Sequence, residues 1–451
     1  MRNHPSFLSL PLSVLGLALL AVIAWPSPAQ AATRTVTNCN DSGAGSLRAM
    51  ITGAASGDTI DLRSLTCSRI VLAGQIAIPQ QDLTLLGPGR FALTIDGNRA
   101  DRVFAHGGTG RLLIDRVSIA YGNKEGFEYQ RGGCIDSLGT VELRRSRVHH
   151  CRVWVEDAIE GQADGGGIAA MNVLLDRSSV FSNIAGQKGN GGGMLARVVT
   201  LYRSQVYGNA VQGQGGGILG STVTATYSLV HGNDARLGGG ISAQEVHLNK
   251  STVSANRALE RPFLGPGESE AGGIYLNQFA SPQARSTIVD STISGNSAYN
   301  YSAGQLAGEV LIYNSTITNN LENAPDTADM GTCQGTGALY APTLRLESTI
   351  VSGNHCTLPG SLDIAPNTTV SGQRNLIGSS AVTVPADSIR VTDPRLAPLA
   401  ENGGPTRTHL PLADSPVLDR GSNLLNREFD QRGPGFPRVK GPGPDIGAVE
   451  R

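Results

Sequence analysis

The chain has 451 residues, 58 of them glycine, and its 36 Lys and Arg residues balance 37 Asp and Glu residues, so its formal net charge is −1. A charge so close to zero excludes the basic excess that nucleic-acid-binding proteins carry, and a hydrophobic content of 39% is too high for a disordered chain. Glycine is about twice as frequent as usual but has no three-residue period, which excludes collagen. We therefore expect a folded, turn-rich, all-β protein.

Residues 1–31 have the pattern of an export signal. Arg2 and His4 precede an apolar stretch from Leu8 to Ala24, and Ala29-Gln30-Ala31 supplies the small residues of a cleavage site. The apolar stretch is interrupted by a proline and is too short for a full membrane span. No later segment is long and apolar enough to cross a bilayer. We expect a secreted, periplasmic or cell-surface protein with no transmembrane span after signal removal.

Residues 32–69 are predicted to form an N-terminal cap. Within them, Ser46 to Ala54 has the pattern of a short amphipathic helix, with Ser46 as its N-cap. Leu47, Met50, Ile51 and Ala54 share one face of that helix, which would cover the first coil of the domain that follows.

A repeat in residues 70–392 predicts the fold. Four copies open on glycines, at Gly165, Gly191, Gly215 and Gly238, and each reaches an asparagine 18 residues later. The apolar residues between them recur at a spacing of two, which is typical of β-strands and not of helical repeats. Copies of about 23 to 26 residues with three short strands each predict one turn of a parallel β-helix, and we expect roughly ten to thirteen such coils.

Equivalent residues of successive coils would stack about 4.8 Å apart. Ile168, Met194, Ile218 and Ile241 would form one buried row, and Val180, Val206, Val230 and Val253 another. The asparagines that close the repeats are expected to form a structural ladder in which each amide bonds to the next coil; they are Asn183, Asn209, Asn233, Asn256, Asn296, Asn320 and Asn354. The glycine triplets are also interpreted as structural, because no GK[ST] follows them.

Four long insertions separate an asparagine from the next glycine, at residues 124–131, 152–164, 257–271 and 321–335. We expect coil length to vary only at this position, so that every insertion projects from one edge of the solenoid, where binding faces often lie. The insertions carry twelve acidic residues against five basic ones. Candidate ligand-binding residues in these and a shorter insertion are Phe127, Tyr129, Trp154, Phe263, Tyr299, Tyr301, Glu156, Asp157 and Asp164.

Six cysteines in an exported chain are typical of disulfides and not of metal ligands. Their spacing predicts three local pairs: Cys39 with Cys67, Cys134 with Cys151, and Cys333 with Cys356. No CxxC or Cys/His cluster of zinc type occurs, so we expect no metal site.

The two ends of the chain resemble a known group of exported bacterial proteins. "NCNDSGAGSLRAMI" (Asn38 to Ile51) is similar to the N-terminal region of CSLREA-type proteins. Residues 393–451 are predicted to form an irregular C-terminal cap, and their segments "DPRLAPLAENGGPTRTHLPLADSPVLDRGS", "DQRG" and "DIGAVE" resemble the choice-of-anchor Q domain. The resemblance implies a single-stranded, right-handed, pectin-lyase-like β-helix, export and surface display. Related chains often continue into an anchoring tail, whereas this sequence stops at Arg451, so we expect release.

Two classes of function remain open. The first is a non-catalytic surface or adhesion protein that binds a neutral or cationic glycan, or a cell-surface protein, through aromatic rings rimmed by carboxylates. The alternative is a polysaccharide lyase or glycoside hydrolase with a carboxylate site assembled in the same loops. The N-T-D, D-D, G-H-G and R-I-K segments of polygalacturonase-like enzymes do not occur, and Ala105-His106-Gly107 is the nearest approach to one of them. We therefore name no catalytic residue, cofactor or metal. Calcium would be needed only if it bridged a polyanion to the acidic loops, and no motif in the sequence supports it.

Overall fold

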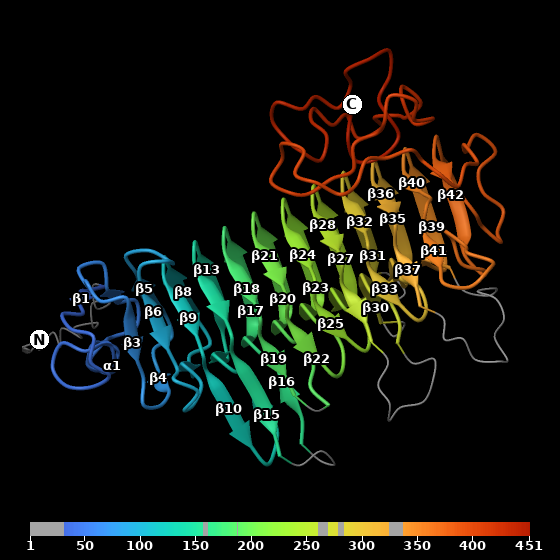
Figure 1. Cartoon of the computed structure of the whole chain (residues 1–451). Helices are drawn as coiled ribbons and strands as arrows, with labels where there is room; N and C mark the ends of the chain where they lie inside the picture. The colour runs from blue at the N-terminus through green and yellow to red at the C-terminus, as the bar shows by residue number, and fades with distance from the viewer. Residues whose placement is uncertain (1–30, 157–160, 187, 260–268, 278–283, 324–336) are drawn as a thin grey trace, which may run out of the picture. The chain divides into compact units, whose positions relative to one another are not determined.

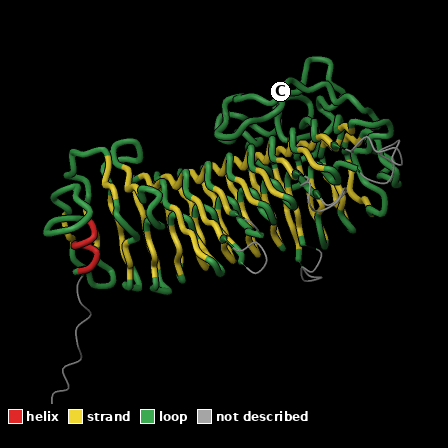
Figure 2. The backbone as a smooth tube through the Cα atoms, turned by 60° about the horizontal axis from the view of Figure 1, so that its bottom comes forward, coloured by secondary structure: helices red, strands yellow, loops and turns green. Residues whose placement is uncertain are grey.

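The computed structural model describes residues 31–156, 161–186, 188–259, 269–277, 284–323 and 337–451. Residues Ala31–Arg451 form one compact unit, a right-handed parallel β-helix whose strands stack coil upon coil (Figures 1 and 2). The expected export signal lies outside the described residues except for its last position. The described residues contain no helix long and apolar enough to span a membrane.

Three long sheets run along the solenoid, and every strand pairing in them is parallel. Sheet A has twenty strands: β1 (Thr33–Thr35), β2 (Thr59–Asp61), β4 (Ile76–Ile78), β5 (Leu83–Leu86), β7 (Phe104–His106), β8 (Arg111–Asp115), β12 (Ile135–Ser137), β13 (Thr140–Arg144), β17 (Ile168–Asp176), β20 (Met194–Tyr202), β23 (Ile218–Thr226), β26 (Ile241–Ala243), β27 (Glu245–Asn249), β30 (Ile274–Leu276), β31 (Arg285–Val289), β34 (Gly304–Gln305), β35 (Glu309–Tyr313), β38 (Leu339–Tyr340), β39 (Thr343–Glu347) and β42 (Thr369–Gln373).

Sheet B has twelve strands, one for each of twelve coils: β3 (Arg69–Val71), β6 (Thr94–Asp96), β9 (Ser118–Ala120), β14 (Arg147–His149), β18 (Ser179–Phe181), β21 (Gln205–Tyr207), β24 (Leu229–His231), β28 (Thr252–Ser254), β32 (Thr292–Ser294), β36 (Thr316–Thr318), β40 (Ile350–Val351) and β43 (Leu376–Ile377). This number lies within the range that the repeat length predicts.

Sheet C is the narrowest, with nine strands: β10 (Asn123–Gly126), β15 (Arg152–Val155), β19 (Ile184–Ala185), β22 (Ala210–Val211), β25 (Asp234–Ala235), β29 (Arg257–Ala258), β33 (Ser297–Ala298), β37 (Leu321–Glu322) and β41 (His355–Cys356). A separate pair, β11 (Gln130–Arg131) and β16 (Ala163–Asp164), joins two of the insertions.

The interior consists of aliphatic rows in register. Ile168 pairs with Met194, which pairs with Ile218 and in turn with Ile241, and all four are buried. The valine row of sheet B is also buried and paired from Val180 to Val253. Apolar side chains alternate with polar ones along each strand, so the inward-facing apolar side chain of one coil packs on the equivalent side chain of the next coil. This stacking is why the sequence forms a solenoid.

The seven ladder asparagines lie in one buried row. In each step a side-chain Nδ2 donates to the Oδ1 of the next coil, at 2.9 Å from Asn183 to Asn209 and 2.8 Å from Asn320 to Asn354. The row ends on a carboxylate, because Asn354 Nδ2 donates to Asp363 Oδ1 at 2.7 Å. These bonds satisfy buried amides at the turn between sheets B and C.

A second ladder, which the repeat analysis missed, lies at the turn between sheets A and B. In most of its steps a backbone N–H donates at 3.1 Å to a hydroxyl of the next coil, as from Ser178 to Ser204 and from Ser204 to Ser228. Its buried members are Ser146, Ser178, Ser204, Ser228, Ser251, Ser291, Ser315, Thr349 and Asn375.

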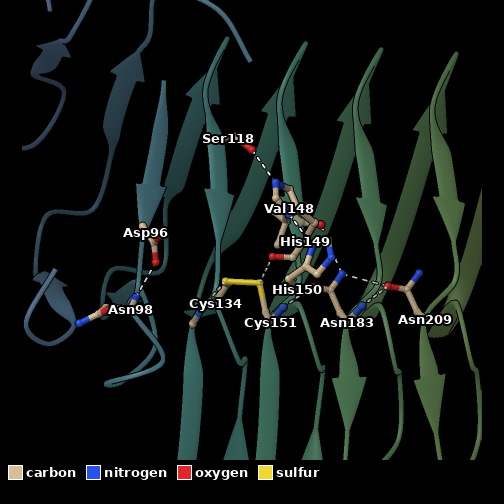
Figure 3. The surroundings of a disulfide bond; sticks show 11 residues. Asp96, Asn98, Ser118, Cys134, Val148, His149, His150, Cys151, Asn183 and Asn209 are labelled. Atoms are coloured by element: carbon tan, nitrogen blue, oxygen red, sulfur yellow. Dashed lines mark hydrogen bonds between the residues drawn. A yellow bond between two sulfur atoms is a disulfide. The ribbon is translucent and has the colours of Figure 1, made fainter. Parts of the chain in front are cut away.

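Two of the three predicted disulfides are confirmed. Cys39 and Cys67 are linked with Cα atoms 6.5 Å apart, and Cys134 and Cys151 with Cα atoms 5.4 Å apart (Figure 3). Cys151 occupies a ladder position, since its backbone N–H donates to Asn183 Oδ1 at 3.0 Å. The third predicted pair includes Cys333, which lies outside the described residues.

The N-terminal helix α1 spans Leu47–Thr52, and the Ser46 side chain accepts a hydrogen bond from the Ala49 N–H. Leu47 and Ile51 are buried, and Met50 and Ala54 pack against the same core. The segment around the helix also supplies strands, because β1 pairs with β2 and β2 with β5 of sheet A.

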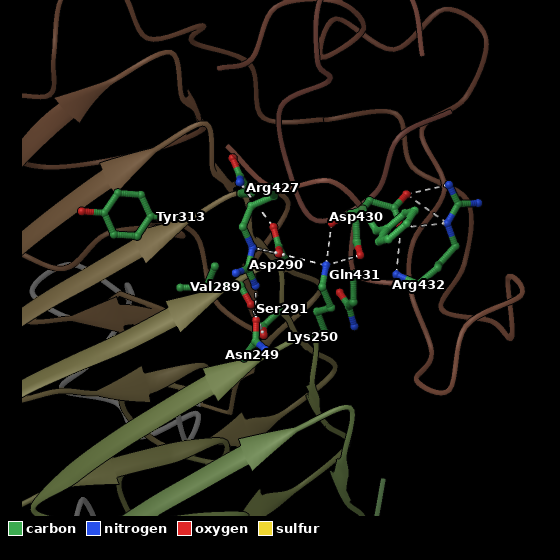
Figure 4. Close-up of polar contacts among 12 residues, drawn as sticks. Asn249, Lys250, Val289, Asp290, Ser291, Tyr313, Arg427, Asp430, Gln431 and Arg432 are labelled. Carbon is green, nitrogen blue, oxygen red and sulfur yellow. Dashed lines mark hydrogen bonds and ion pairs between the residues drawn. The ribbon is translucent and has the colours of Figure 1, made fainter. Parts of the chain in front are cut away.

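The region 393–451 has no strand and packs along the side of the solenoid, beside β28, β32, β36 and β40 (Figure 1). Buried Asp290 binds Lys250 at 3.0 Å and Arg427 at 2.7 Å, and the Lys250 ammonium also donates to the carbonyl oxygens of Phe429 and Asp430 (Figure 4). The last coil is covered instead by residues just before this region, where Val382 and Val384 pack against the core.

The expectation that coil length varies only between an asparagine and the next glycine is wrong. Ile241 pairs with Ile274 and His247 with Thr287, so seven additional residues lie between β30 and β31, within sheet A. A longer connection also joins β5 to β6, at the corner between sheets A and B. Local stacking requires only that paired strands keep their register, so any turn can lengthen.

Candidate functional site

The structure separates the predicted ligand-binding residues into two groups. Phe127, Tyr129 and Trp154 lie on or beside β10 and β15, in the early coils of sheet C. Tyr299 and Tyr301 follow β33, five strands further along the same sheet. Of the remaining predicted residues, Glu156 is exposed at the end of β15 and Asp164 belongs to β16, whereas Phe263 and Asp157 lie outside the described residues.

The first group forms an exposed aromatic projection. Phe127 is 72% exposed and Tyr129 52%, while the Trp154 ring packs over Gly186 and lies 4.4 Å from the guanidinium carbon of Arg152. The Tyr129 hydroxyl donates to Asp164 Oδ2 at 2.9 Å. Burial, with the neighbouring Asp164 charge, raises the pKa of Tyr129 to about 12, so this hydroxyl is a donor throughout the physiological pH range.

Asp164 begins a hydrogen-bonded row that crosses four coils. Asp164 is only 3% exposed, and burial raises the pKa of its carboxyl. Its Oδ1 accepts from the backbone N–H of Asn190 at 2.8 Å, and Asn190 Oδ1 accepts from the backbone N–H of Gln214 at 3.0 Å. Gln214 Oε1 then accepts from the Ser242 hydroxyl at 3.2 Å.

This row borders a groove of about 450 Å³ on the outer surface of sheet A, which we call the amide groove. Its floor is formed by β20, β23 and β26, where Gly220 and neighbouring small residues leave the space open. Its polar lining residues are Asn190, Arg197, Gln214, Ser221, Ser242, Gln244 and Asn277. Side-chain amides and hydroxyls can both donate and accept, so the lining is suited to a ligand rich in hydroxyl groups.

Beyond the groove, the register of sheet A leads from Ser242 to tyrosines near the second predicted group. Ser242 pairs in register with Tyr275, Tyr275 with Gln305, and Gln305 with Tyr340. The ring of Tyr340 lies 5.4 Å from that of Tyr301. Tyr301 has a φ of 55°, at the corner where earlier coils have glycine, and a bulky side chain in that conformation is strained.

A half-buried carboxyl, that of Glu270, lies beside these tyrosines. Burial raises the pKa of Glu270, and the Glu270 charge adds to the burial that raises the pKa of Tyr275 and Tyr301. The backbone N–H of Tyr301 donates to Glu322 Oε1 at 3.1 Å.

Sequence reasoning identified Tyr129 and Asp164 but missed the amides between them and Tyr275. A signal for them exists, because the residue before the first glycine is polar in three successive copies: Asp164, Asn190 and Gln214. None of the predicted ligand-binding residues that the structure describes is among those that line the groove; Tyr129 and Asp164 are connected to it through Asn190.

The described part of the groove contains hydrogen-bonding groups and one guanidinium, and its lining includes no carboxylate. Within the described residues, no group of three or more His, Cys, Asp or Glu side chains is placed to hold a metal ion. What this geometry can do chemically is bind hydroxyl groups along an extended line and stack rings at either end.

No family model matches the chain, and no curated protein is similar to it. Among solved structures, the crystal structure of pectate lyase Pel9A aligns with a TM-score of 0.46 at 16% sequence identity, over 94% of this chain and 98% of that one. The stacked parallel sheets themselves define this protein as a parallel β-helix. The CSLREA-type and choice-of-anchor Q resemblance of its ends remains an expectation.

Proposed function

We propose that this protein is an exported, non-catalytic β-helix that binds a neutral glycan along the amide groove, between Tyr129 and Tyr275. The observation that carries the proposal is the continuous row from Asp164 through Asn190 and Gln214 to Ser242. The row sets polar groups at one-coil intervals along the solenoid axis, in line with an extended chain.

The chemistry of the lining favours a neutral sugar over a charged one. Amide and hydroxyl groups meet the mixed donors and acceptors of sugar hydroxyls, and among the described lining residues only Arg197 is charged. Tyrosine rings at the two ends offer apolar faces for sugar rings, with a hydroxyl that remains in water.

Binding without cleavage is favoured by the state of Asp164, the carboxylate at the start of the row. Hydrolysis by a carboxylate pair requires two carboxyl groups about 5–10 Å apart across the scissile bond. Asp164 is buried, and it already accepts hydrogen bonds from Tyr129, Gln162 and Asn190.

Placement outside the cytoplasm is supported by the pattern of residues 1–31, by the resemblance to CSLREA-type and choice-of-anchor Q proteins, and by the disulfides. Disulfides persist in oxidising compartments and are rare in the cytosol.

A second candidate, a polysaccharide hydrolase or lyase, rests on Glu270. This carboxyl has a raised pKa and lies near Tyr275 and Tyr301 at the far end of the row, which is typical of a general acid.

The two candidates differ in their products. The purified protein would be incubated with a panel of neutral polysaccharides, with and without calcium, and tested for retention, new reducing ends and unsaturated products. The glycan-binding proposal expects retention without cleavage. Cleavage that is lost in Glu270→Gln would establish the enzyme instead.

The site of binding is tested with Gln214→Ala and Tyr129→Ala, measured by calorimetry or affinity electrophoresis. We expect each variant to weaken binding about tenfold, because each removes one hydrogen-bonding or stacking group. Gln205→Ala, an exposed glutamine on sheet B, is the matched control and should bind like the unmodified protein. Equal binding by all three variants would exclude the amide groove.

A further inference from the structure

Four arginines occupy equivalent positions at the corner between sheets A and B. Arg116, Arg145, Arg177 and Arg203 have φ values of 58°, 47°, 50° and 48° and directly follow β8, β13, β17 and β20. The residues before them pair in register from Asp115 to Tyr202, so the four corners lie one coil apart, about 4.8 Å each.

Two further arginines flank this line. The connection between β5 and β6 reaches across the coils, and Arg90 Nη1 donates to the carbonyl oxygen of Arg177 at 2.8 Å. Arg147 begins β14 of sheet B, and its guanidinium carbon lies 4.5 Å from the centre of the Phe91 ring. We call Arg90, Arg116, Arg145, Arg147, Arg177 and Arg203 the arginine ridge.

The arginine ridge has more positive charge than its carboxylates neutralise. Asp115 binds Arg145 at 3.0 Å and lies 3.7 Å from Arg116, and Asp176 lies 3.7 Å from Arg177. Among the described residues, two carboxylates therefore lie within 4 Å of these six guanidinium groups, and Asp61, which Arg63 already binds, is a more distant neighbour of Arg116.

Arg147 and Arg203 contact aromatic rings instead of carboxylates. Arg203 lies 5.5 Å from the Tyr202 ring and 5.6 Å from the Tyr227 ring, and Arg147 contacts Phe91 and, at 5.8 Å, Phe181. The Nε of Arg147 is buried and has no hydrogen-bond partner among the described residues.

Further along the chain, the same corner between sheets A and B binds the C-terminal region. In later coils the equivalent positions are Lys250 and Asp290, which bind residues 427–430 of the C-terminal region (Figure 4). The C-terminal region reaches the coil of Arg203, where Gln205 lines a pocket together with Glu401 and Arg407, whereas nearer the N-terminus the side chains of Arg145 and Arg177 are about half exposed.

We propose that the arginine ridge binds a linear anionic glycan, as a second site independent of the amide groove. Guanidinium groups bind carboxylate, sulfate and phosphate through paired hydrogen bonds, and all six cations here are arginines. Phe91 is 77% exposed and offers a ring face for a sugar between Arg90 and Arg147. An anionic group on successive sugars matches cations repeated at each coil.

The acidic insertions do not oppose this ligand, because the long insertions 124–131 and 152–164 leave the coil between sheets C and A. The arginine ridge lies at the corner between sheets A and B, where the chain has already passed the insertion and not yet reached sheet C.

The experiment measures binding of three calcium-free polyanions: a sulfated glycosaminoglycan, a polyuronate and a glycan polymer bearing phosphodiesters. The three arms distinguish the source of the oxyanion, and binding of any one of them supports the proposal. We expect affinity to fall as ionic strength rises, because the attraction is between partly exposed charges. Failure of all three to bind in low salt would overturn it.

The site is tested by Arg90→Gln/Arg147→Gln/Arg203→Gln, which removes three cations that have no carboxylate partner. We expect at least a tenfold loss of polyanion affinity and unchanged affinity for the neutral glycan of the amide groove. Arg285→Gln, on the exposed face of sheet A beside Glu309, is the matched control for loss of charge. An equal loss in the control, or none in the triple variant, would refute the arginine ridge as the site.

Folding of the variants is checked by their thermal unfolding. Should the triple variant unfold early, Arg203→Gln alone is measured, because Arg203 is exposed and contacts only neighbouring rings. The single variant is expected to weaken binding several-fold, and unchanged binding would count against the proposal.

Discussion

Asn233 lies in the middle of the asparagine ladder and is fully buried. Its Nδ2 donates to Asn256 Oδ1 at 2.9 Å and to the Val206 carbonyl at 3.0 Å, and its Oδ1 accepts from the backbone N–H and Nδ2 of Asn209. One side chain thus satisfies polar groups in two neighbouring coils, which an apolar residue of similar size cannot do.

Replacing this amide should therefore be costly. We expect Asn233→Leu to lower the free energy of unfolding by about 3 kcal/mol or more, because it leaves buried donors and acceptors of both neighbouring coils unsatisfied. Urea unfolding followed by circular dichroism measures the change. Gln205→Leu, at an exposed position of sheet B, should change it by less than about 0.5 kcal/mol, and similar values for the two variants would contradict the ladder.

Val230 tests the orientation of the sheet B strands in the same way. It is 1% exposed and stacks between Val206 and Val253. Val230→Asp would bury an unpaired carboxylate among aliphatic side chains, so we expect severe destabilisation. A thermal unfolding midpoint close to that of the unmodified protein would show that the strand faces the other way.

Glu450 is expected to make the free energy of unfolding depend on pH. Burial, with the charge of nearby Asp445, raises its pKa from an ordinary 4.5 to about 7. An acid with a raised pKa stabilises the folded state below its unfolded pKa and loses that contribution as pH rises through the folded pKa. The stabilisation by protonated Glu450 is therefore present at pH 4.5 and lost by about pH 7 to 8.

We expect Glu450→Gln to remove this dependence. The difference in unfolding free energy between pH 5 and pH 8 should shrink by on the order of 1 to 3 kcal/mol relative to the unmodified protein. Glu428→Gln, an exposed position in the same region, serves as the control and should leave the difference unchanged. An unaltered pH profile in Glu450→Gln would show that another group titrates.

The coil is the element that repeats, and its third glycine and its asparagine are coupled. A methyl carbon on Gly193 would lie 2.9 Å from the Asn209 side chain, and one on Gly217 3.0 Å from that of Asn233. The nearest atom in each case is the carbonyl oxygen of the next coil's glycine, at 2.5 and 2.7 Å, so glycine fits best at this position, although Ala303 and Ala338 occupy it in later coils. In the coil of β12 to β15, cysteines occupy both positions, Cys134 and Cys151, and a covalent bond replaces the packed pair.

Because cysteines stand where other coils have glycine and asparagine, we expect that glycine and asparagine can partly restore the stability lost with the disulfide. Cys134→Ala/Cys151→Ala should cost about 3 kcal/mol, the value that chain entropy gives for a loop of this length. Cys134→Gly/Cys151→Asn should recover about 1 kcal/mol of that loss or more, because the new amide can donate to Asn183 Oδ1. Urea unfolding of both double variants provides the comparison, and equal stabilities would show that the two pairs are not interchangeable.

At the scale of the whole molecule, the C-terminal region is held to the solenoid by buried charges. Asp290 is fully buried between Lys250 and Arg427, which come from different parts of the chain. Further contacts join Ser294 to His409 at 2.8 Å and the N–H of Ala448 to the Thr316 hydroxyl at 3.0 Å. Removing one partner of such a pair leaves a buried charge without compensation.

Arg427→Ala should accordingly destabilise the attachment by about 3 kcal/mol and increase cleavage of the C-terminal region in limited proteolysis. Adding Asp290→Asn should deepen the loss, because it takes the carboxylate partner away from the buried Lys250 ammonium. Arg420→Ala, an exposed arginine of the same region, is the control and should be cleaved like the unmodified protein. Unchanged protection in Arg427→Ala would show that other contacts hold the region.

The sequence by itself determined the coil, because strand alternation and a constant spacing of 18 residues are local signals that each coil repeats. The α1 helix and the pairing of Cys134 with Cys151 follow from equally local spacings. For the candidate site, sequence reasoning reached Tyr129 and Asp164, whose insertions are conspicuous, but not Asn190 and Gln214, whose role depends on neighbours in adjoining coils.

Only the tertiary structure decided what lies on the outside of the solenoid. Arg427 meets Asp290 across 137 residues, and Ala448 meets Thr316 across 132, and no periodicity encodes such separations. Those contacts determine where the C-terminal region docks and which corner arginines remain uncovered. The physical reason is that a coil is stabilised by its nearest neighbours, whereas a surface is formed by whichever distant segments pack against it.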